Sequence, residues 1–134
     1  MPDYVLDSYA MLAFFRNEEG GEKVKAYLNE AAANRLELYM SCINAGEVYY
    51  MSVRKDGVIK AEAAWIALFK FPIHILEVDF EHTLAAANIK AKYSLSYADA
   101  FAAALTIKRK ATLITGDREF DALSGEAGFK VKYL

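Results

Sequence analysis

The sequence predicts an α/β fold, a three-layer α/β/α sandwich around a mainly parallel central sheet of about five strands. Segments of strand composition alternate with segments of helical pattern along the whole chain, and this order is typical of a parallel sheet covered by helices. The chain also has 134 residues, of which 55% are hydrophobic, which is enough to fill one core. We therefore expect residues 1–134 to form a single domain.

The first strand and the first helix meet at an acidic residue. Tyr4 to Leu6 is an apolar run suited to a strand that is buried on both faces, and it ends at Asp7. A nearly continuous apolar block of helical character follows from Tyr9 to Phe15. A carboxylate is thus expected where a strand ends and a helix begins, at the edge where open α/β sheets bind ligands.

Two helices and one strand are predicted next. Apolar residues recur at helical spacing from Glu22 to Ala33, so we expect one helix there. Leu38 to Ser41 has the composition of a second strand. Ser41 is also suited to cap a helix that runs from Cys42 to about Arg54 and closes at Asp56-Gly57.

The second half of the chain repeats this order. Val58 to Phe71 predicts a helix that Pro72 stops, and Ile73 to Val78 has strand composition. Asp79 or Glu81 can cap the next helix, which runs to Tyr93. After a break at Ser94 to Ser96, the remaining elements are a helix from Tyr97 to about Lys108, a strand from Thr112 to Thr115 and a last strand from Phe129 to Leu134.

Composition and charge narrow the classes of function. Cys42 is the single cysteine and no basic and apolar leader opens the chain, so we expect a cytoplasmic protein. The longest apolar block, Ala61 to Phe71, contains charged residues and is too short for a membrane span, so no membrane role is expected. The net charge of −2 is not that of a general nucleic-acid binder. Local basic clusters can bind phosphate or can simply end helices, and they are Arg54-Lys55, Lys108-Arg109-Lys110, and Lys130 with Lys132.

Four acidic residues are candidate metal ligands. Asp7 and Asp117 each follow a strand, and parallel strands share the edge at their carboxyl ends. Asp99 lies in the first turn of a helix beside small alanines. Glu47 lies in the middle of a helix on an apolar stripe that we expect to face the interior, formed by Ile43, Tyr50 and Met51.

Each acid also has a structural explanation when it is taken alone. These explanations are a helix cap for Asp7, a capping box with Ser96 for Asp99, turn chemistry after Gly116 for Asp117 and an ion pair with Arg54 for Glu47. Four independent coincidences at one edge are a weaker explanation than one shared site. We therefore expect the four carboxylates to converge.

Convergence of the four carboxylates requires a cation between them. Two carboxylates about 4 Å apart repel by about 4 kcal/mol at an effective dielectric constant of about 20. A hard divalent ion with oxygen ligands removes this penalty, and Mg²⁺ or Mn²⁺ keeps bound waters and binds phosphate. Cys42, His74 and His82 offer no zinc spacing, so zinc is disfavoured. Such a site suits phosphodiester hydrolysis by a metal-activated water.

Four short motifs contain these acids and follow one another over nearly the whole chain. They are Val5-Leu6-Asp7-Ser8, Asn44-Ala45-Gly46-Glu47-Val48, Ser96-Tyr97-Ala98-Asp99-Ala100-Phe101 and Leu113-Ile114-Thr115-Gly116-Asp117-Arg118-Glu119-Phe120. Together they resemble the motifs of PIN-domain nucleases, and most of all those of the VapC-type toxin ribonucleases of bacteria and archaea. The chain departs from the family pattern at Tyr9, where a smaller residue is often found, and this departure bears on the fit of the substrate.

The resemblance implies a PIN-like fold and a metal-dependent endoribonuclease that hydrolyses RNA. Its cofactor would be Mg²⁺, with Mn²⁺ as a substitute. Its catalytic and metal-binding residues would be Asp7, Glu47, Asp99 and Asp117, with Ser8, Thr115 and Asp121 as supporting polar residues.

The resemblance also implies protein partners. Proteins of this type form homodimers, and in a VapBC-type toxin–antitoxin pair a cognate antitoxin covers a hydrophobic groove near the acids. The candidates for that groove, which can equally be core residues, are Tyr9, Phe14, Phe15, Tyr49, Tyr50 and Met51.

Two other functions remain open. A non-catalytic module of the same fold would bind RNA or protein without metal-dependent cleavage. A phosphatase or phospho-acceptor domain would use Asp7 as its nucleophile. Such sites usually carry a second acid close by, whereas Ser8 and Tyr9 follow here.

Overall fold

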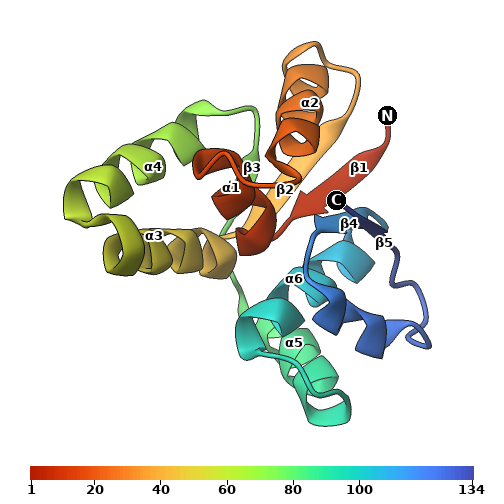
Figure 1. Ribbon diagram of the computed structural model, residues 1–134. Coiled ribbons are helices and arrows are strands. Elements are labelled where there is room, and N and C mark those ends of the chain that lie inside the picture. Colours follow the sequence, from red (N-terminus) through yellow and green to blue (C-terminus); the bar gives the residue numbers. More distant parts are fainter.

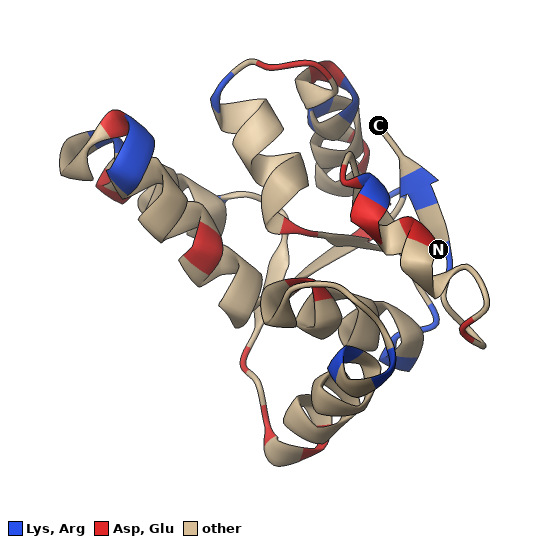
Figure 2. Ribbon diagram, turned by 60° about the horizontal axis from the view of Figure 1, so that its bottom comes forward, with Lys and Arg blue, Asp and Glu red and all other residues tan.

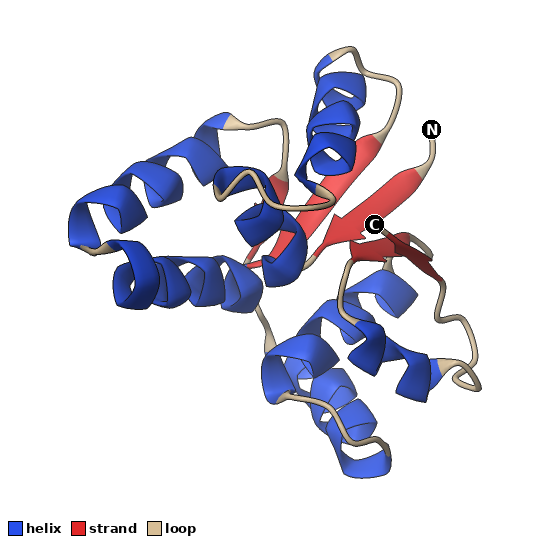
Figure 3. Ribbon diagram, in the orientation of Figure 1, coloured by secondary structure: helices blue, strands red, loops and turns tan.

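Five parallel strands form one sheet in the computed structural model, which describes residues 1–134 (Figure 3). The strand order is β3-β2-β1-β4-β5, and every neighbouring pair is parallel. The predicted parallel sheet of five strands is therefore confirmed. The strands are β1 (Asp3–Leu6), β2 (Glu37–Ser41), β3 (His74–Leu76), β4 (Thr112–Thr115) and β5 (Val131–Tyr133).

The strand order reverses at β1. From β1 the chain adds β2 and β3 on one side, and it then returns to add β4 and β5 on the other. Leu6 pairs with Ile114, so the residues that follow β1 and β4 leave the sheet side by side. In open α/β sheets such a reversal leaves a crevice at the carboxyl ends of the strands, where ligands bind.

Helices cover both faces of the sheet, as Figure 1 shows. The first four helices pack on one face, and the last two pack on the other. This is the three-layer arrangement that the sequence predicts. The helices are α1 (Ser8–Phe15), α2 (Gly21–Ala32), α3 (Cys42–Asp56), α4 (Val58–Lys70), α5 (Phe80–Lys92) and α6 (Tyr97–Lys108), and a short 3-10 helix, η1 (Arg118–Leu123), follows β4.

Each face of the sheet has its own apolar core. Val5 and Leu113 belong to the cluster covered by α5 and α6, whereas Leu6 and Ile114 belong to the cluster beneath the first four helices. All four side chains are fully buried, because successive side chains of a strand point to opposite faces and both faces are covered. Burial of each such side chain contributes about 1.5–3 kcal/mol to stability. The edge that carries the acids is therefore anchored by packing on both sides.

Capping residues set the start of four helices. In each case a side-chain oxygen just before the helix accepts a hydrogen bond from a backbone N–H of the first turn. The predicted caps are thereby confirmed. They are Asp7 for α1, Ser41 for α3, Asp79 for α5 and Ser96 for α6.

The outer strands are shorter than the sequence predicts. The strand expected from Ile73 to Val78 is reduced to His74–Leu76, and the one expected from Phe129 to Leu134 is reduced to Val131–Tyr133. Both are edge strands with a neighbour on one side only, so residues beyond that neighbour's register have no ladder partner. The 3-10 helix η1 is absent from the prediction, because its 6 residues are too few to show a periodic pattern. None of the helices combines the length and the apolar character needed to cross a bilayer.

Candidate metal centre

A cavity of about 620 Å³ opens beside the carboxyl ends of β1 and β4. The four predicted acids Asp7, Glu47, Asp99 and Asp117 all line it, although they come from four separate parts of the chain. The charged residues that complete its lining are Arg16, Glu18, Glu19 and Glu119. Carboxylates therefore greatly outnumber the single guanidinium.

Asp7 is the most deeply placed of these acids, with 1% of its surface exposed. Its Oδ1 accepts a hydrogen bond from the Ala10 N–H at 2.9 Å, and its Oδ2 accepts one from Thr115 Oγ1 at 2.5 Å. Burial raises the pKa of Asp7 to about 7 although both hydrogen bonds act to lower it, and the charges of Asp99 and Asp117 add to the rise. Because both oxygens are held in place, the carboxylate suits a fixed ligand better than a nucleophile.

Thr115 and Asp117 continue this network from the end of β4. The Asp117 N–H donates to Thr115 Oγ1 at 3.0 Å, so the threonine hydroxyl accepts from one acid's backbone and donates to the other acid's side chain. Asp117 Oδ1 accepts from the Glu119 N–H at 2.9 Å, which starts η1. The ends of β1 and β4 are thus locked together by polar groups that also set the direction of the carboxylates.

Asp99 enters the cavity from the first turn of α6. Its N–H donates to Ser96 Oγ at 3.1 Å, which fixes the start of the helix. The residue is 8% exposed, and burial raises its pKa to about 6, with the Asp117 charge as the next cause. The predicted capping role of Ser96 and the position of Asp99 in the cavity are therefore compatible.

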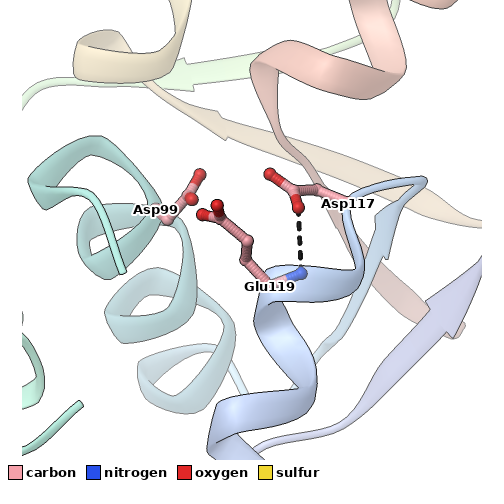
Figure 4. A group of neighbouring side chains, drawn as sticks. All are labelled: Asp99, Asp117 and Glu119. Carbon is pink, nitrogen blue, oxygen red and sulfur yellow. Dashed lines mark hydrogen bonds between the residues drawn. The ribbon is translucent and has the colours of Figure 1, made fainter. Parts of the chain in front are cut away.

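Glu119 was not predicted as a site residue, yet it joins Asp99 and Asp117. One ligand oxygen from each of these three residues lies within 4.8 Å of the others, and Figure 4 shows the three side chains pointing toward one another from α6, the end of β4 and η1. The sequence feature that could have predicted Glu119 is its position two residues after Asp117. This feature is weak evidence alone, because the 3-10 helix η1 is what directs the Glu119 side chain into the cavity.

Asp121, predicted as a supporting residue at the rim, does not line the cavity. Its Oδ1 accepts a hydrogen bond from the Tyr133 hydroxyl at 2.6 Å instead. The physical reason is the tight winding of η1, which has about three residues per turn and therefore places residues 119 and 121 on different sides of the helix.

Glu47 reaches the cavity from α3, and its partners are hydroxyl groups. The Ser8 hydroxyl donates to Glu47 Oε1, and the Tyr50 hydroxyl approaches Oε2 at 3.5 Å. The alternative ion pair with Arg54 does not form, because that guanidinium lies 5.1 Å from the centre of the Tyr50 ring. Ser8 is thus a support for Glu47, and Thr115 is a support for Asp7.

The prediction that the Glu47 stripe faces the interior is wrong for Ile43, which is 38% exposed, and for Tyr50, which is 46% exposed. Met51 is partly buried against the core. The buried face of α3 is formed by Asn44, Ala45, Val48 and Ser52. Hydrophobic residues alone do not define the buried face, because α3 packs on its neighbours along the stripe of smaller side chains. Glu47 therefore has access to solvent and to a ligand.

The donor set fits a hard divalent cation. The candidate ligands are carboxylate oxygens, and neither histidine nor cysteine lines the cavity. The raised pKa values of Asp7 and Asp99 also favour a cation site, since these buried carboxyl groups require either a bound proton or a nearby cation. A bound divalent cation would satisfy that requirement at neutral pH.

No residue of the three basic clusters lines this cavity, although Lys55 lies 3.8 Å from Glu18 of the lining. The clusters occupy the end of α3, the end of α6 and the region of β5, and Figure 2 shows lysine and arginine mainly toward the outer ends of helices. Arg109 lies over the ring of Tyr39 at 3.9 Å. The end-of-helix explanation therefore accounts for the clusters of α3 and α6.

Comparison with known proteins identifies both a family and a fold. The family model described as PIN domain matches residues 4–126. No curated protein matches the chain significantly. Among solved structures, VapBC2 of Rickettsia felis, bound to a promoter DNA fragment, is 15% identical with a TM-score of 0.76 and covers 98% of each chain.

Two further structures have the same architecture. DNA-bound VapBC of Salmonella typhimurium is 16% identical, with a TM-score of 0.76 and coverage of 99% of this chain and 98% of that one. VapC20 of Mycobacterium tuberculosis, described as a toxin that cleaves the sarcin-ricin loop, is 17% identical, with a TM-score of 0.74 and coverage of 90% and 95%. At these identities the likeness is one of fold.

Proposed function

Because the chain belongs to the PIN-domain family, we propose that it is a metal-dependent endoribonuclease and the toxin of a VapBC-type toxin–antitoxin pair. The observation that carries this proposal is the convergence of Asp7, Glu47, Asp99 and Asp117 on one cavity from four separate segments. The fold neighbours support it, since one is described as a toxin that cleaves the sarcin-ricin loop and others as VapBC proteins.

In this proposal the four acids hold Mg²⁺, with Mn²⁺ as a substitute. Carboxylate oxygens of Asp99 and Asp117 already lie within 4.8 Å of each other and of one from Glu119, which assists from η1, and Asp7 and Glu47 line the same cavity. When bound, the ion supplies an activated water and neutralises charge on the scissile phosphate. The chain's own contribution is to fix the carboxylates, through Thr115 at Asp7 and Ser8 at Glu47. Pre-oriented ligands of this kind lower the cost of reorganisation when substrate arrives.

Arg16 is the basic residue through which this cavity can contact an RNA phosphate. Its Nη2 donates to the Met51 carbonyl oxygen at 3.3 Å, and its Nε lies 3.8 Å from Asp56 Oδ2. These contacts hold the guanidinium at the end of α1, where the side chain remains 16% exposed. A fixed guanidinium suits a phosphate because its planar donors match two oxygens at once.

The proposed partners are a cognate antitoxin and a second copy of the chain, and the proposed location is the cytoplasm. Tyr9 and Met51 border the cavity, and they are the members of the candidate groove that an antitoxin segment can reach there. Phe14 and Phe15 instead pack against Phe71, with ring centres 5.6 and 6.0 Å apart, which agrees with the core explanation for this pair.

The direct test is cleavage of single-stranded RNA by the purified chain with Mg²⁺, with Mn²⁺ and with a chelator. Cleavage is expected with either ion and not with the chelator. Asp99→Asn should abolish it, whereas Asp121→Asn, an acid outside the cavity, should not. Equal cleavage by the chelated protein and by Asp99→Asn would refute a metal-dependent mechanism at this site.

The same assay separates the two other readings. A non-catalytic module would bind RNA equally with and without metal and would release no product. A phospho-acceptor would instead form an acyl-phosphate on Asp7 when incubated with a phosphate donor.

A further inference from the structure

Tyr9 stands at the mouth of the acidic cavity, in the first turn of α1, and 45% of its surface is exposed. It is neighboured in sequence by Ser8, which holds Glu47, and it follows Asp7 by two positions. Part of this aromatic ring is thus open to water beside a cluster of carboxylates, where a ligand of the cavity can contact it.

The ring of Tyr9 is held in place by the backbone of Gly116. A Cβ atom at position 116 would lie 2.2 Å from Cε1 and 2.7 Å from Cζ of the ring, so a larger residue fits there only if the ring moves. Gly116 has no positive φ that would otherwise require glycine. Close contact with the Tyr9 ring thus favours glycine between Thr115 and Asp117, and one edge of the ring lies against the loop that leads into Asp117.

Other half-exposed tyrosines of the chain have partners that Tyr9 lacks. Tyr97, equally exposed at 45%, packs against the ring of Phe101 at 4.9 Å. Tyr50, at 46%, lies under the guanidinium of Arg54. Tyr9 has neither a ring partner nor a cation, and the part of its ring that Gly116 does not cover borders the cavity.

We propose that Tyr9 is a stacking platform for a nucleobase of single-stranded RNA that flanks the phosphodiester bond to be cut. This inference rests on the proposed nuclease function. Unpaired bases are bound by stacking on aromatic side chains, and such stacking accepts any base because every base has a π-face. The surrounding carboxylates repel the phosphate backbone, so an uncharged contact close to the acids can hold a nucleotide in position in addition to a phosphate contact of Arg16.

The test measures binding and cleavage separately. Short single-stranded oligouridine carrying one fluorescent adenine analogue is titrated onto the chain in the Asp99→Asn background, where stacking of the analogue quenches its emission. Tyr9→Phe should bind and quench like the parent. Tyr9→Leu keeps apolar bulk against Gly116 but has no π-face, and it should weaken binding roughly 5- to 150-fold, the range measured for one stacked base. Tyr97→Ala, a tyrosine of the same exposure outside the cavity, should change neither signal.

Cleavage kinetics with Asp99 restored give a second readout. Tyr9→Leu should raise KM far more than it lowers kcat. A merely structural role would lower the melting temperature and leave KM as it is.

The outcomes separate this inference from the nuclease proposal. Cleavage by the parent with equal KM and equal quenching in Tyr9→Leu would overturn the role of Tyr9 and leave the nuclease intact. Quenching that depends on Tyr9 in a chain that never cleaves RNA would sustain the stacking role and refute the nuclease. A parent chain that neither binds nor cleaves the oligonucleotide overturns both.

Discussion

Thr115 donates a hydrogen bond from Oγ1 to Oδ2 of Asp7 across 2.5 Å, although the two residues are 108 positions apart in the chain. The same hydroxyl accepts from the Asp117 N–H, so it connects the two acids that end β1 and β4. Two effects act in opposite directions on the pKa of the buried Asp7 carboxylate. The hydrogen bonds favour its charged form, whereas burial favours the protonated form.

Replacement of Asp7 by asparagine should separate stability from activity. Asp7→Asn keeps the side-chain shape and removes a buried charge, and its amide can donate to Thr115 Oγ1. We expect cleavage to be lost while the metal-free variant melts at a higher temperature than the parent near pH 8. Thermal unfolding with chelator, compared with RNA cleavage, measures both. A lower melting temperature of the variant at that pH would contradict the inference that the charge of Asp7 destabilises the metal-free protein.

The stability of the metal-free protein should fall as the pH rises. Asp7 has a pKa of about 7 in the folded chain against 3.8 as the reference, so the folded state binds the proton more tightly than the unfolded state. The proton on Asp7 therefore stabilises the folded state, by on the order of 4 kcal/mol at most in the free energy of unfolding. This stabilisation is fully present below about pH 4 and is lost as the pH rises through about 7. Asp99, with a pKa of about 6, acts in the same direction.

Metal should reverse this loss. Mg²⁺ or Mn²⁺ competes with protons for the same carboxylates, so the rise in melting temperature on adding metal should be larger near pH 8 than near pH 5. Melting curves with and without a chelator at both pH values provide the measurement. A metal effect that is equal at both values would argue against binding at Asp7 and Asp99.

Thr115→Val tests the connection between the two strand ends. The variant leaves Asp7 Oδ2 and the Asp117 N–H without their partner, which should cost about 1–3 kcal/mol and raise the pKa of Asp7 further. Metal binding should then require a higher pH. Thr106→Val is the matched control, because Thr106 is equally buried but donates only to the Ala102 carbonyl one helical turn before it. Similar shifts in both variants would show that the effect is one of general packing.

Glu119→Gln should weaken metal binding more than Asp121→Asn does. Both acids belong to η1, yet only Glu119 lies with Asp99 and Asp117, whereas Asp121 accepts from Tyr133. Because Glu119 is exposed, we expect a partial loss of affinity, smaller than that of Asp99→Asn. Titration of Mn²⁺ followed by calorimetry orders the variants. The reverse order would restore Asp121 as the assisting acid.

Arg16→Ala should raise KM for RNA and reduce the salt dependence of binding by about one phosphate contact, a slope change of about 0.7 for a single strand. The physical reason is the loss of the one cation that lines the cavity. Arg35→Ala is the control, since its guanidinium is 68% exposed and pairs with Glu30 away from the cavity. An unchanged salt slope in Arg16→Ala would remove the phosphate contact from the proposal.

The fold could be predicted from the sequence because its signals are local. Strand runs such as Tyr4 to Leu6 and caps such as Ser41 and Ser96 depend on neighbours in the chain, and parallel topology then places the ends of β1 and β4 at one edge. This is also why Asp7 and Asp117 could be assigned to one cavity.

The remaining features depend on contacts between distant segments. The bond from Thr115 to Asp7 and the contact of Tyr9 with Gly116 have no sequence signature, since neither residue type requires such a partner. Glu119 depends on the winding of a short 3-10 helix. The prediction for the Glu47 stripe of α3 was wrong at Ile43 and Tyr50 for a related reason. The neighbours of a helix, and not its own sequence pattern, decide which side of it is buried.

The ring of Tyr9 against Gly116 also restricts how this protein can change over generations. While the ring of Tyr9 keeps its position, a Cβ at position 116 would lie 2.2 Å from its Cε1, so a larger residue there requires the ring to move. A lineage that exchanges the glycine must therefore also move or replace the ring. Changes at positions 9 and 116 are thus coupled through the packing of one side chain on the loop that leads into Asp117.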